Sequence, residues 1–324
     1  MRCLLLTFDC LPRRWIGCYG SLDSTTRGFD RLAALGTTFD TAITANVASS
    51  AEEIAGFRVL QQNRRAQVFG AGVELSLPIE VITSADAPAA SRKGRKRAAS
   101  RLSHELHQAS SWLRDQNRHC LAWVRHPGLH VPGAPLATPD DLSSLLAQLA
   151  VIDEELDAFL DEWLDCAEER WTLAITASRG VIRPRTVTRR RDERTPNDPA
   201  FTDDLIRVPL LVLEGRGEGF GRRRLGLLPT VRLAEAVRDS IAANDHALAG
   251  RLREAPPADA LVIRGDNGRA AVRTADWLFV RSVEGDREAG EGQLFRKPED
   301  ACDVFDVRSE HTDVAIRLDS LIEA

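Results

Sequence analysis

The sequence predicts an α/β fold in which a mostly parallel sheet is flanked by helices and followed by a small C-terminal antiparallel α+β subdomain. Short apolar runs bounded by turn signals, as at 3–8 and 119–124, are typical of strands buried on both faces of a parallel sheet. Apolar residues at three- and four-residue spacing between 145 and 160 predict a long amphipathic helix. From about residue 248 the pattern changes, and 270–281 alternates as an antiparallel hairpin does.

Length and composition indicate an ordinary globular protein of two unequal parts. A chain of 324 residues can bury one large core and a small appended one, which we place at 1–247 and 248–324. With 43% hydrophobic and 28% charged residues it has the composition of an ordinary globular protein, no apolar stretch is long enough to span a bilayer, and the net charge of -5 argues neither for nor against a polyanionic partner. The six cysteines show no CxxC spacing and the apolar run at 4–6 is too short for a signal peptide, so we expect reduced thiols and a cytoplasmic location.

The first strand ends in a single acidic residue. The apolar run 3–8 stops at Asp9, and Pro12 and a Gly-Cys-Tyr-Gly turn at 17–20 follow. A carboxylate at the carboxyl end of a parallel strand lies where open α/β sheets place their ligands. The alternative is that Asp9 caps the helix or turn that follows it.

Three consecutive segments carry a family resemblance. Residues 16–20 read Ile-Gly-Cys-Tyr-Gly, 26–36 read Thr-Arg-Gly-Phe-Asp-Arg-Leu-Ala-Ala-Leu-Gly, and 38–42 read Thr-Phe-Asp-Thr-Ala. In this order they resemble the opening of the sulfatase family in the alkaline-phosphatase-like superfamily. The resemblance implies the fold given above, with Asp9 as a metal-binding residue, and a family chemistry that uses Ca²⁺ and a formylglycine nucleophile. Whether this chain keeps that chemistry is a separate question, because a fold does not fix a function.

The expected nucleophile motif is altered. Active sulfatases have Cys or Ser in C/S-x-P-x-R, and alignment from Phe39 puts Ala48 at the nucleophile and Glu52 at the arginine. Ser49 is displaced by one place and lacks the following Pro and Arg. Ser49 could act as a displaced nucleophile, or Ser49 and Ser50 could cap a helix with Glu52 in its first turn.

Other substrate-binding positions are only partly retained. The family's GKWHLG-like segment corresponds to 70–74, which contains neither Lys nor His. His130 matches the histidine of a PHxP-like segment that contacts substrate in family members. The alternative is that His130 and its neighbouring prolines only shape a loop.

The expected metal site has lost most of its ligands. Residues 171–180 resemble the family's T-L-V-V-V-T-S-D-H-G strand, and the positions of its Asp and His are Ser178 and Arg179. The second Asp of the first strand is Cys10. Arginine has no lone pair to offer and stays protonated, whereas a divalent cation needs several oxygen or nitrogen ligands. We therefore predict that the site holds no metal.

An arginine in place of a metal ion suggests a charge pair. We expect the Arg179 guanidinium to occupy the former cation position and to pair with Asp9, and also with Glu52. A buried carboxylate left without a partner would cost several kcal/mol, on the order of the desolvation penalty of one ion.

Later segments extend the resemblance to the end of the chain. Residues 205–213 resemble the family's LRVPLIV strand, 227–237 the start of its following helix, and 293–300 its C-terminal ELY/LF-V-KPDD segment. We infer that the whole architecture persists in shortened form.

Basic clusters occur at 92–97, 183–194 and 222–224. Such runs can contact phosphates, but they are more often solvated surface, and no aromatic residues interleave them as a single-strand platform requires. Nucleic acid is therefore not an expected partner.

These features together predict a catalytically degenerate sulfatase-like protein with a binding or regulatory role. It would need no cofactor, and its partner would be an unidentified small anionic ligand or a protein. The alternatives are an active sulfuric or phosphoric ester hydrolase with an atypical site, and a polyanion-binding module that uses the basic clusters.

Overall fold

A computed structural model describes most of the chain. The described residues are 1–44, 57–60, 65–68, 74–75, 79–83, 102–117, 119–129, 139–167, 171–181, 201–217, 221–243, 245, 247–265, 269–281 and 291–323. Of the predicted site residues, Ala48, Ser49, Glu52 and His130 lie outside this part of the chain, as do the basic clusters at 92–97 and 183–194.

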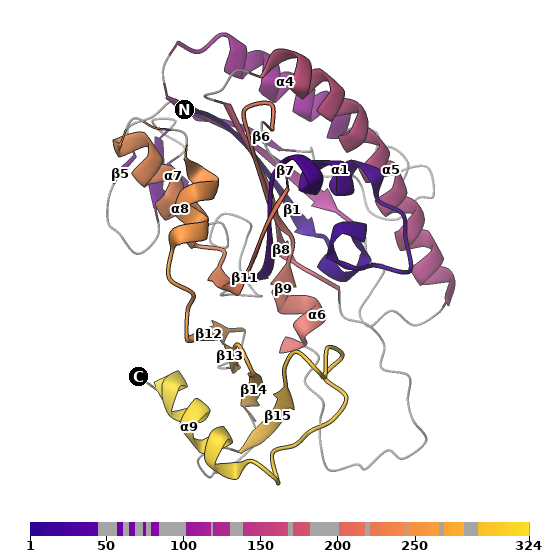
Figure 1. Cartoon of the computed structure of the whole chain (residues 1–324), viewed down its shortest axis with the longest axis vertical. Helices are drawn as coiled ribbons and strands as arrows, with labels where there is room; N and C mark the ends of the chain where they lie inside the picture. Colours follow the sequence, from indigo (N-terminus) through magenta and orange to yellow (C-terminus); the bar gives the residue numbers. More distant parts are fainter. Residues whose placement is uncertain are drawn as a thin grey trace.

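A mixed eight-stranded sheet forms the centre of the molecule (Figure 1). Its strands are β1 (Arg2–Cys10), β2 (Thr37–Ile43), β6 (Ile79–Thr83), β7 (Cys120–Gly128), β8 (Trp171–Arg179), β9 (Arg207–Val208), β10 (Leu210–Glu214) and β11 (Arg222–Pro229). Their order is β11-β2-β10-β8-β1-β7-β6, with β9 paired to β2. The central strand β1 runs parallel to both β7 and β8, whereas β10 is antiparallel to its neighbours β8 and β2. The predicted mostly parallel sheet is confirmed.

Helices cover both faces of this sheet, as a strand buried on two sides requires. Helices α1 (Arg27–Leu35), α4 (Leu102–Arg114) and α5 (Pro139–Cys166) lie on one face, and α7 (Arg232–Ala242) and α8 (Leu248–Glu254) lie on the other (Figure 1). The long helix predicted from the spacing between 145 and 160 is α5, whose apolar stripe is buried in the main core. None of the helices in the described part of the chain is long and apolar enough to cross a membrane.

A second sheet builds the C-terminal subdomain. Strands β12 (Ala260–Arg264), β13 (Ala270–Thr274), β14 (Trp277–Arg281) and β15 (Gly292–Arg296) pair in this order, all antiparallel. Helix α9 (Thr312–Glu323) packs on one face of the sheet and shares a core with Val272 and Phe279. The other face shares a core with Ile43 and Ile206 of the main domain. Alternate side chains of β13 and β14 are therefore buried on opposite faces of this sheet. The predicted α+β subdomain is confirmed.

Short elements connect these parts. Two 3-10 turns, η1 (Arg13–Trp15) and η2 (Gly17–Tyr19), follow β1, and the one-turn helix α6 (Asp203–Ile206) precedes β9. Strands β3 (Phe57–Leu60), β4 (Arg65–Val68) and β5 (Glu74–Leu75) make a small antiparallel sheet. Helix α8 packs into the main core through Leu248 and Leu252. The second sheet begins after this helix, at Ala260.

Candidate functional site at the carboxyl edge of the sheet

The carboxyl ends of β1, β7 and β8 meet at one level of the sheet. In the register of the parallel pairs, Cys10 lies opposite both Gly128 and Arg179. The Leu11 amide donates to the Arg179 carbonyl, and the Leu129 amide donates to the Cys10 carbonyl, each at 2.9 Å. The register thus brings the ends of three strands together although they lie far apart in the sequence.

A glycine allows this close approach. Gly128 has a φ of +70°, and a Cβ built on it would lie 2.1 Å from the Cys10 carbonyl oxygen. A side chain at this position would meet both a backbone clash and a disfavoured dihedral. Gly128 therefore sets how closely β7 can follow β1 at the candidate site.

Two of the four predicted former metal-site residues are exposed and two are buried. Asp9 and Arg179 are exposed at the edge, while Cys10 and Ser178 are about 5% exposed. Burial raises the pKa of the Cys10 thiol to about 12; the charge of Arg179 lowers it and the charge of Asp9 raises it further. Cys10 is therefore a protonated thiol, whose Sγ donates to the Gly180 carbonyl at 3.4 Å.

The four predicted former metal-site residues, all of which the structure describes, do not supply the donors that a divalent cation prefers. Of the four predicted positions, Asp9 alone offers a carboxylate; Cys10 is a neutral thiol, and Arg179 carries a positive charge. Calcium prefers six to eight oxygen ligands, and magnesium prefers an octahedron of oxygens. Within the described residues, no group of three or more His, Cys, Asp or Glu side chains is placed to hold a metal ion. The predicted pairing of Asp9 with Arg179 and Glu52 stays a prediction.

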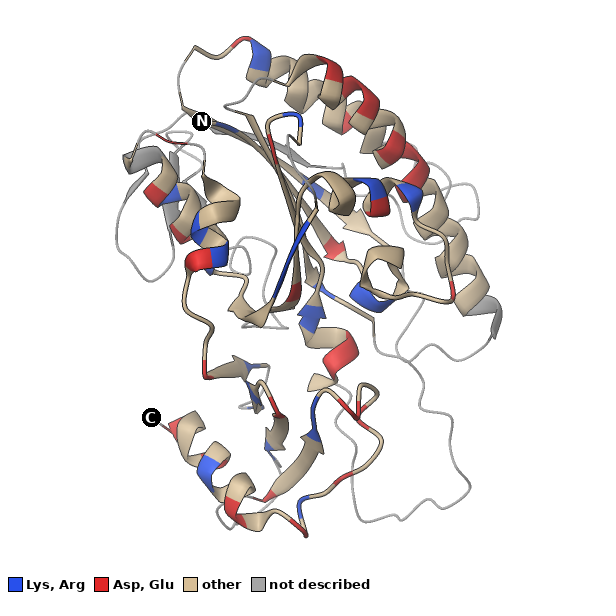
Figure 2. Ribbon diagram, viewed as in Figure 1, with Lys and Arg blue, Asp and Glu red and all other residues tan. Residues whose placement is uncertain are grey.

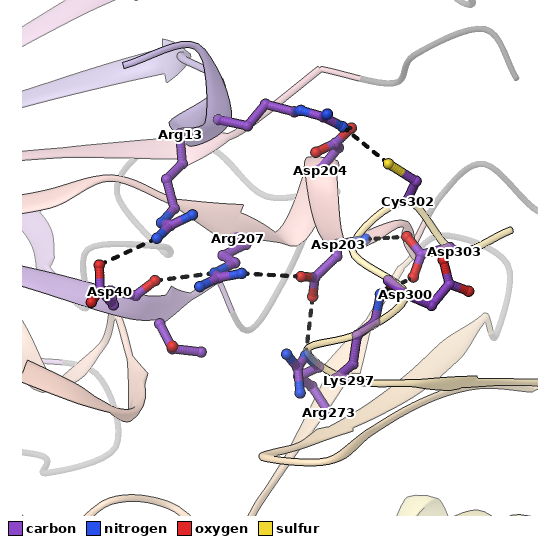
Figure 3. Close-up of polar contacts among 12 residues, drawn as sticks. Arg13, Asp40, Asp203, Asp204, Arg207, Arg273, Lys297, Asp300, Cys302 and Asp303 are labelled. Atoms are coloured by element: carbon purple, nitrogen blue, oxygen red, sulfur yellow. Dashed lines mark hydrogen bonds and ion pairs between the residues drawn. The ribbon is translucent and has the colours of Figure 1, made fainter. Parts of the chain in front are cut away.

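The sequence analysis missed a second charged region. Asp203, Arg273, Lys297 and Asp303 form what we call the junction cluster, between the main domain and the C-terminal subdomain (Figure 3). The exposed fractions of their side chains are only 4%, 3%, 0% and 1%, respectively. Figure 2 shows the acidic start of α6 beside the basic start of β9 at this boundary.

Hydrogen bonds join the members of the junction cluster directly. The Arg273 Nε donates to an Asp203 carboxylate oxygen at 3.0 Å, and the Asp203 amide donates to Asp303 Oδ2 at 2.7 Å. Lys297 pairs with Asp303 Oδ1 and also donates to the Asp300 carbonyl. A one-turn helix of the main domain is thereby tied to β13 and to the loop after β15.

The pKa values of the two buried carboxyl groups of this cluster are shifted in opposite directions. Burial alone would raise the pKa of Asp203, but the charges of Arg273, Lys297 and Arg207 outweigh it and lower that pKa below its usual value. Burial raises the pKa of Asp303 to about 6; Lys297 opposes this rise, and the neighbouring charge of Asp203 adds to it. No pattern in the sequence indicated these contacts, because the partners are separated by 70 and 100 residues.

The basic run 222–224 is mostly used by the fold itself. Arg223 forms an ion pair with Asp40, and Arg224 is buried and donates to the carbonyls of Gly226 and Ala255. Arg222 is exposed on β11. Two of the three arginines thus make contacts within the fold, while Arg222 and Arg223 are both exposed.

Comparisons with solved structures identify the architecture. No family model and no curated protein matches the sequence. A 2-O GAG sulfatase superimposes with a TM-score of 0.65 at 13% identity, covering 99% of this chain and 91% of its own. A protein solved with its substrate D-glucosamine-2-N,6-O-disulfate gives 0.65 at 10% identity, covering 99% and 96%. The phosphonate monoester hydrolase of Agrobacterium radiobacter gives 0.61 at 12% identity, covering 99% and 94%.

The superpositions establish the fold. At sequence identities this low they say nothing of the chemistry, which has to be argued from the residues. The matches cover almost the whole of this chain and nearly all of each neighbour, including the second sheet. The resemblance seen in the short sequence segments is thereby confirmed at the level of the fold. The chain therefore has the fold of the sulfatases of the alkaline-phosphatase-like superfamily.

Proposed function

We propose that this chain is a degenerate sulfatase-fold protein whose sheet edge binds a small anionic ligand or a protein partner without hydrolysing an ester. The observation that carries the proposal is the register of β1 and β8, which puts Arg179 opposite Cys10, the residue after Asp9. A permanent guanidinium charge beside one carboxylate suits an anion or an acidic side chain.

The same position argues against metal-assisted hydrolysis. A guanidinium repels a divalent cation, and it has no lone pair with which to coordinate one. The family's nucleophile position is Ala48, which has no group that could form a covalent intermediate. Loss of one transition-state contact typically costs about 100-fold or more in rate, and several such contacts are missing from the sequence.

Active ester hydrolysis remains the alternative, and the names of the structural neighbours favour it. Those neighbours include a GAG sulfatase and a phosphonate monoester hydrolase. A hydrolase built on this chain would need a displaced nucleophile such as Ser49 and a site that works with Arg179 in place of a metal ligand.

An activity assay separates the two. Purified protein is incubated with an aryl sulfate and an aryl phosphate, with and without added Ca²⁺, alongside the Asp9→Asn variant. We expect no turnover above that of the variant in either case. Turnover that the wild type shows and Asp9→Asn lacks would contradict the proposal, whereas turnover shared by both comes from a contaminant.

A further inference from the structure

A cavity lies beside the junction cluster, and Asp203 of that cluster forms part of its wall. Its volume is about 350 Å³, and its walls come from residues 13–14 and 19–23 after β1, from 203–204 and 207 around α6, and from Ala301 of the C-terminal subdomain. Neither Asp9 nor Arg179 lines it. Its size lies at the lower end of the roughly 300–1,000 Å³ that small-molecule sites occupy.

We propose that this cavity is a second binding site, for a small tetrahedral oxyanion such as a phosphate or sulfate group. Arg13, Arg14 and Arg207 would hold the anion. Guanidinium groups suit this task because their fixed fork of donors matches the oxygens of such groups.

The Arg13 side chain is held in place, and its Nε makes no hydrogen bond within the described residues. Its guanidinium lies over the Tyr19 ring, 4.3 Å from the ring centroid, and its Nη2 lies 3.3 Å from Asp40 Oδ1. The Tyr19 hydroxyl donates to the Leu210 carbonyl at 3.0 Å, which fixes the ring. The Arg13 Nε is buried and has no hydrogen-bond partner among the described residues. Such an unmade bond costs free energy that a ligand oxygen could recover.

Arg13 and Arg207 lie close enough for their charges to interact. Burial and the nearby charge of Arg207 lower the pKa of Arg13 to about 10, although Tyr19, Asp40 and Asp203 oppose this fall. Asp40 pairs with Arg13 and also with Arg223.

Arg207 also shares its carboxylate partner with other cations. Its Nη1 lies 3.5 Å from Asp203, but that carboxylate is also bound by Arg273 and influenced by Lys297. Figure 3 shows Arg13 and Arg207 both reaching toward Asp40 of β2, and the Arg207 Nε donates to the Asp40 carbonyl at 3.0 Å. An anion within reach of both guanidinium groups would reduce the repulsion between them, which is the physical reason to expect one in this cavity.

Arg14 adds a third cation, which is more accessible. It pairs with Asp204 at 2.8 Å and its side chain is 32% exposed. The turn opposite includes Ser21, Leu22 and Asp23, of which Leu22 is 99% exposed. Asp23, Asp203 and Asp204 also line the cavity, and their carboxylates would repel a long polyanion, which favours a small ligand.

Calorimetric titration of the intact protein with inorganic phosphate and, separately, inorganic sulfate tests this site. We expect saturable binding of at least one anion, weakened about tenfold or more by Arg14→Gln through loss of a charge-assisted contact. Arg232→Gln is the matched control, since Arg232 is an ion-paired arginine on α7 that does not line the cavity. Its binding should equal that of the wild type.

Variants of Leu22 test the same site without disturbing the packing. Because this side chain is 99% exposed, Leu22→Glu should weaken anion binding and Leu22→Lys should strengthen it, with unchanged thermal unfolding. Preference for phosphate indicates a phosphate monoester as the natural ligand, and preference for sulfate indicates a sulfate ester.

Three results would overturn the inference. The first is the absence of saturable binding of either anion to the wild type. The second is equal weakening by Arg14→Gln and Arg232→Gln. The third is binding that is lost in Arg179→Gln and kept in Arg14→Gln, which would place the anion at the sheet edge and support the proposed function alone.

Discussion

The sheet edge and the junction cluster carry similar charges in opposite environments. At the edge, Asp9 and Arg179 are exposed at the ends of adjacent strands. In the junction cluster, no side chain is more than 4% exposed. Water screens the exposed charges at the edge, whereas the charges of the junction cluster are held in place by desolvation and by hydrogen bonds. We infer that the junction cluster serves stability and that the edge is available for binding.

The largest expected effect is on stability at the junction. Arg273→Met leaves Asp203 buried without its closest cation, so we expect the free energy of unfolding to fall by about 3–5 kcal/mol. Urea denaturation followed by circular dichroism measures it. The matched variant at the exposed edge, Arg179→Met, should change the same quantity by less than about 1 kcal/mol. Equal losses in the two variants would remove the distinction between the regions.

The next effect is a pH dependence that arises from Asp303 of the junction cluster. The pKa of Asp303 is raised from 3.8 to about 6, so between these values the folded protein holds this proton more tightly than the unfolded chain. The free energy of unfolding should therefore fall as the pH rises from about 4 to 6, by up to about 3 kcal/mol from this group.

Asp303→Asn isolates this contribution. The variant cannot titrate at this position, so its unfolding free energy should lack that decline while other carboxyl groups titrate as before. Denaturation series at several pH values between 4 and 6.5 give the difference between the two proteins. A difference that does not vary across this window would mean that Asp303 titrates near its ordinary value.

The smallest expected effect is at the edge. A double-mutant cycle of Asp9→Asn and Arg179→Gln should give a coupling energy of about 0.2–1 kcal/mol, since both side chains are exposed. Thermal or urea unfolding of the four proteins measures it. A coupling of zero would show that the two charges do not pair, and a value above about 2 kcal/mol would place them in a buried site like the junction.

Local patterns in the sequence predicted the fold well. The apolar runs ending at Asp9 and Arg179 are β1 and β8, and the alternating residues at 270–281 are a hairpin of the second sheet. Such patterns report burial within one element, which is what period and turn signals can convey. The resemblance also assigned Asp9 and Arg179 to one former metal site, and the register brings the carboxyl ends of β1 and β8 together.

The junction cluster could not be predicted in this way. Asp203 lies on a one-turn helix, Lys297 follows a strand and Asp303 lies in a loop. Charged residues at such places are normally predicted to be exposed to solvent. Their burial results from the packing of one domain on the other, which no local period encodes. The cavity beside them depends on the same packing.

The central claim is that the sheet edge has exchanged a metal ion for an arginine. Calorimetric titration with Ca²⁺ tests it directly, with the variant Ser178→Asp/Arg179→Asn, which restores two oxygen ligands beside Asp9, as a comparison. We predict no saturable binding to the wild type and measurable binding to the variant. Binding of one Ca²⁺ per wild-type chain, abolished by Asp9→Asn, would contradict the account.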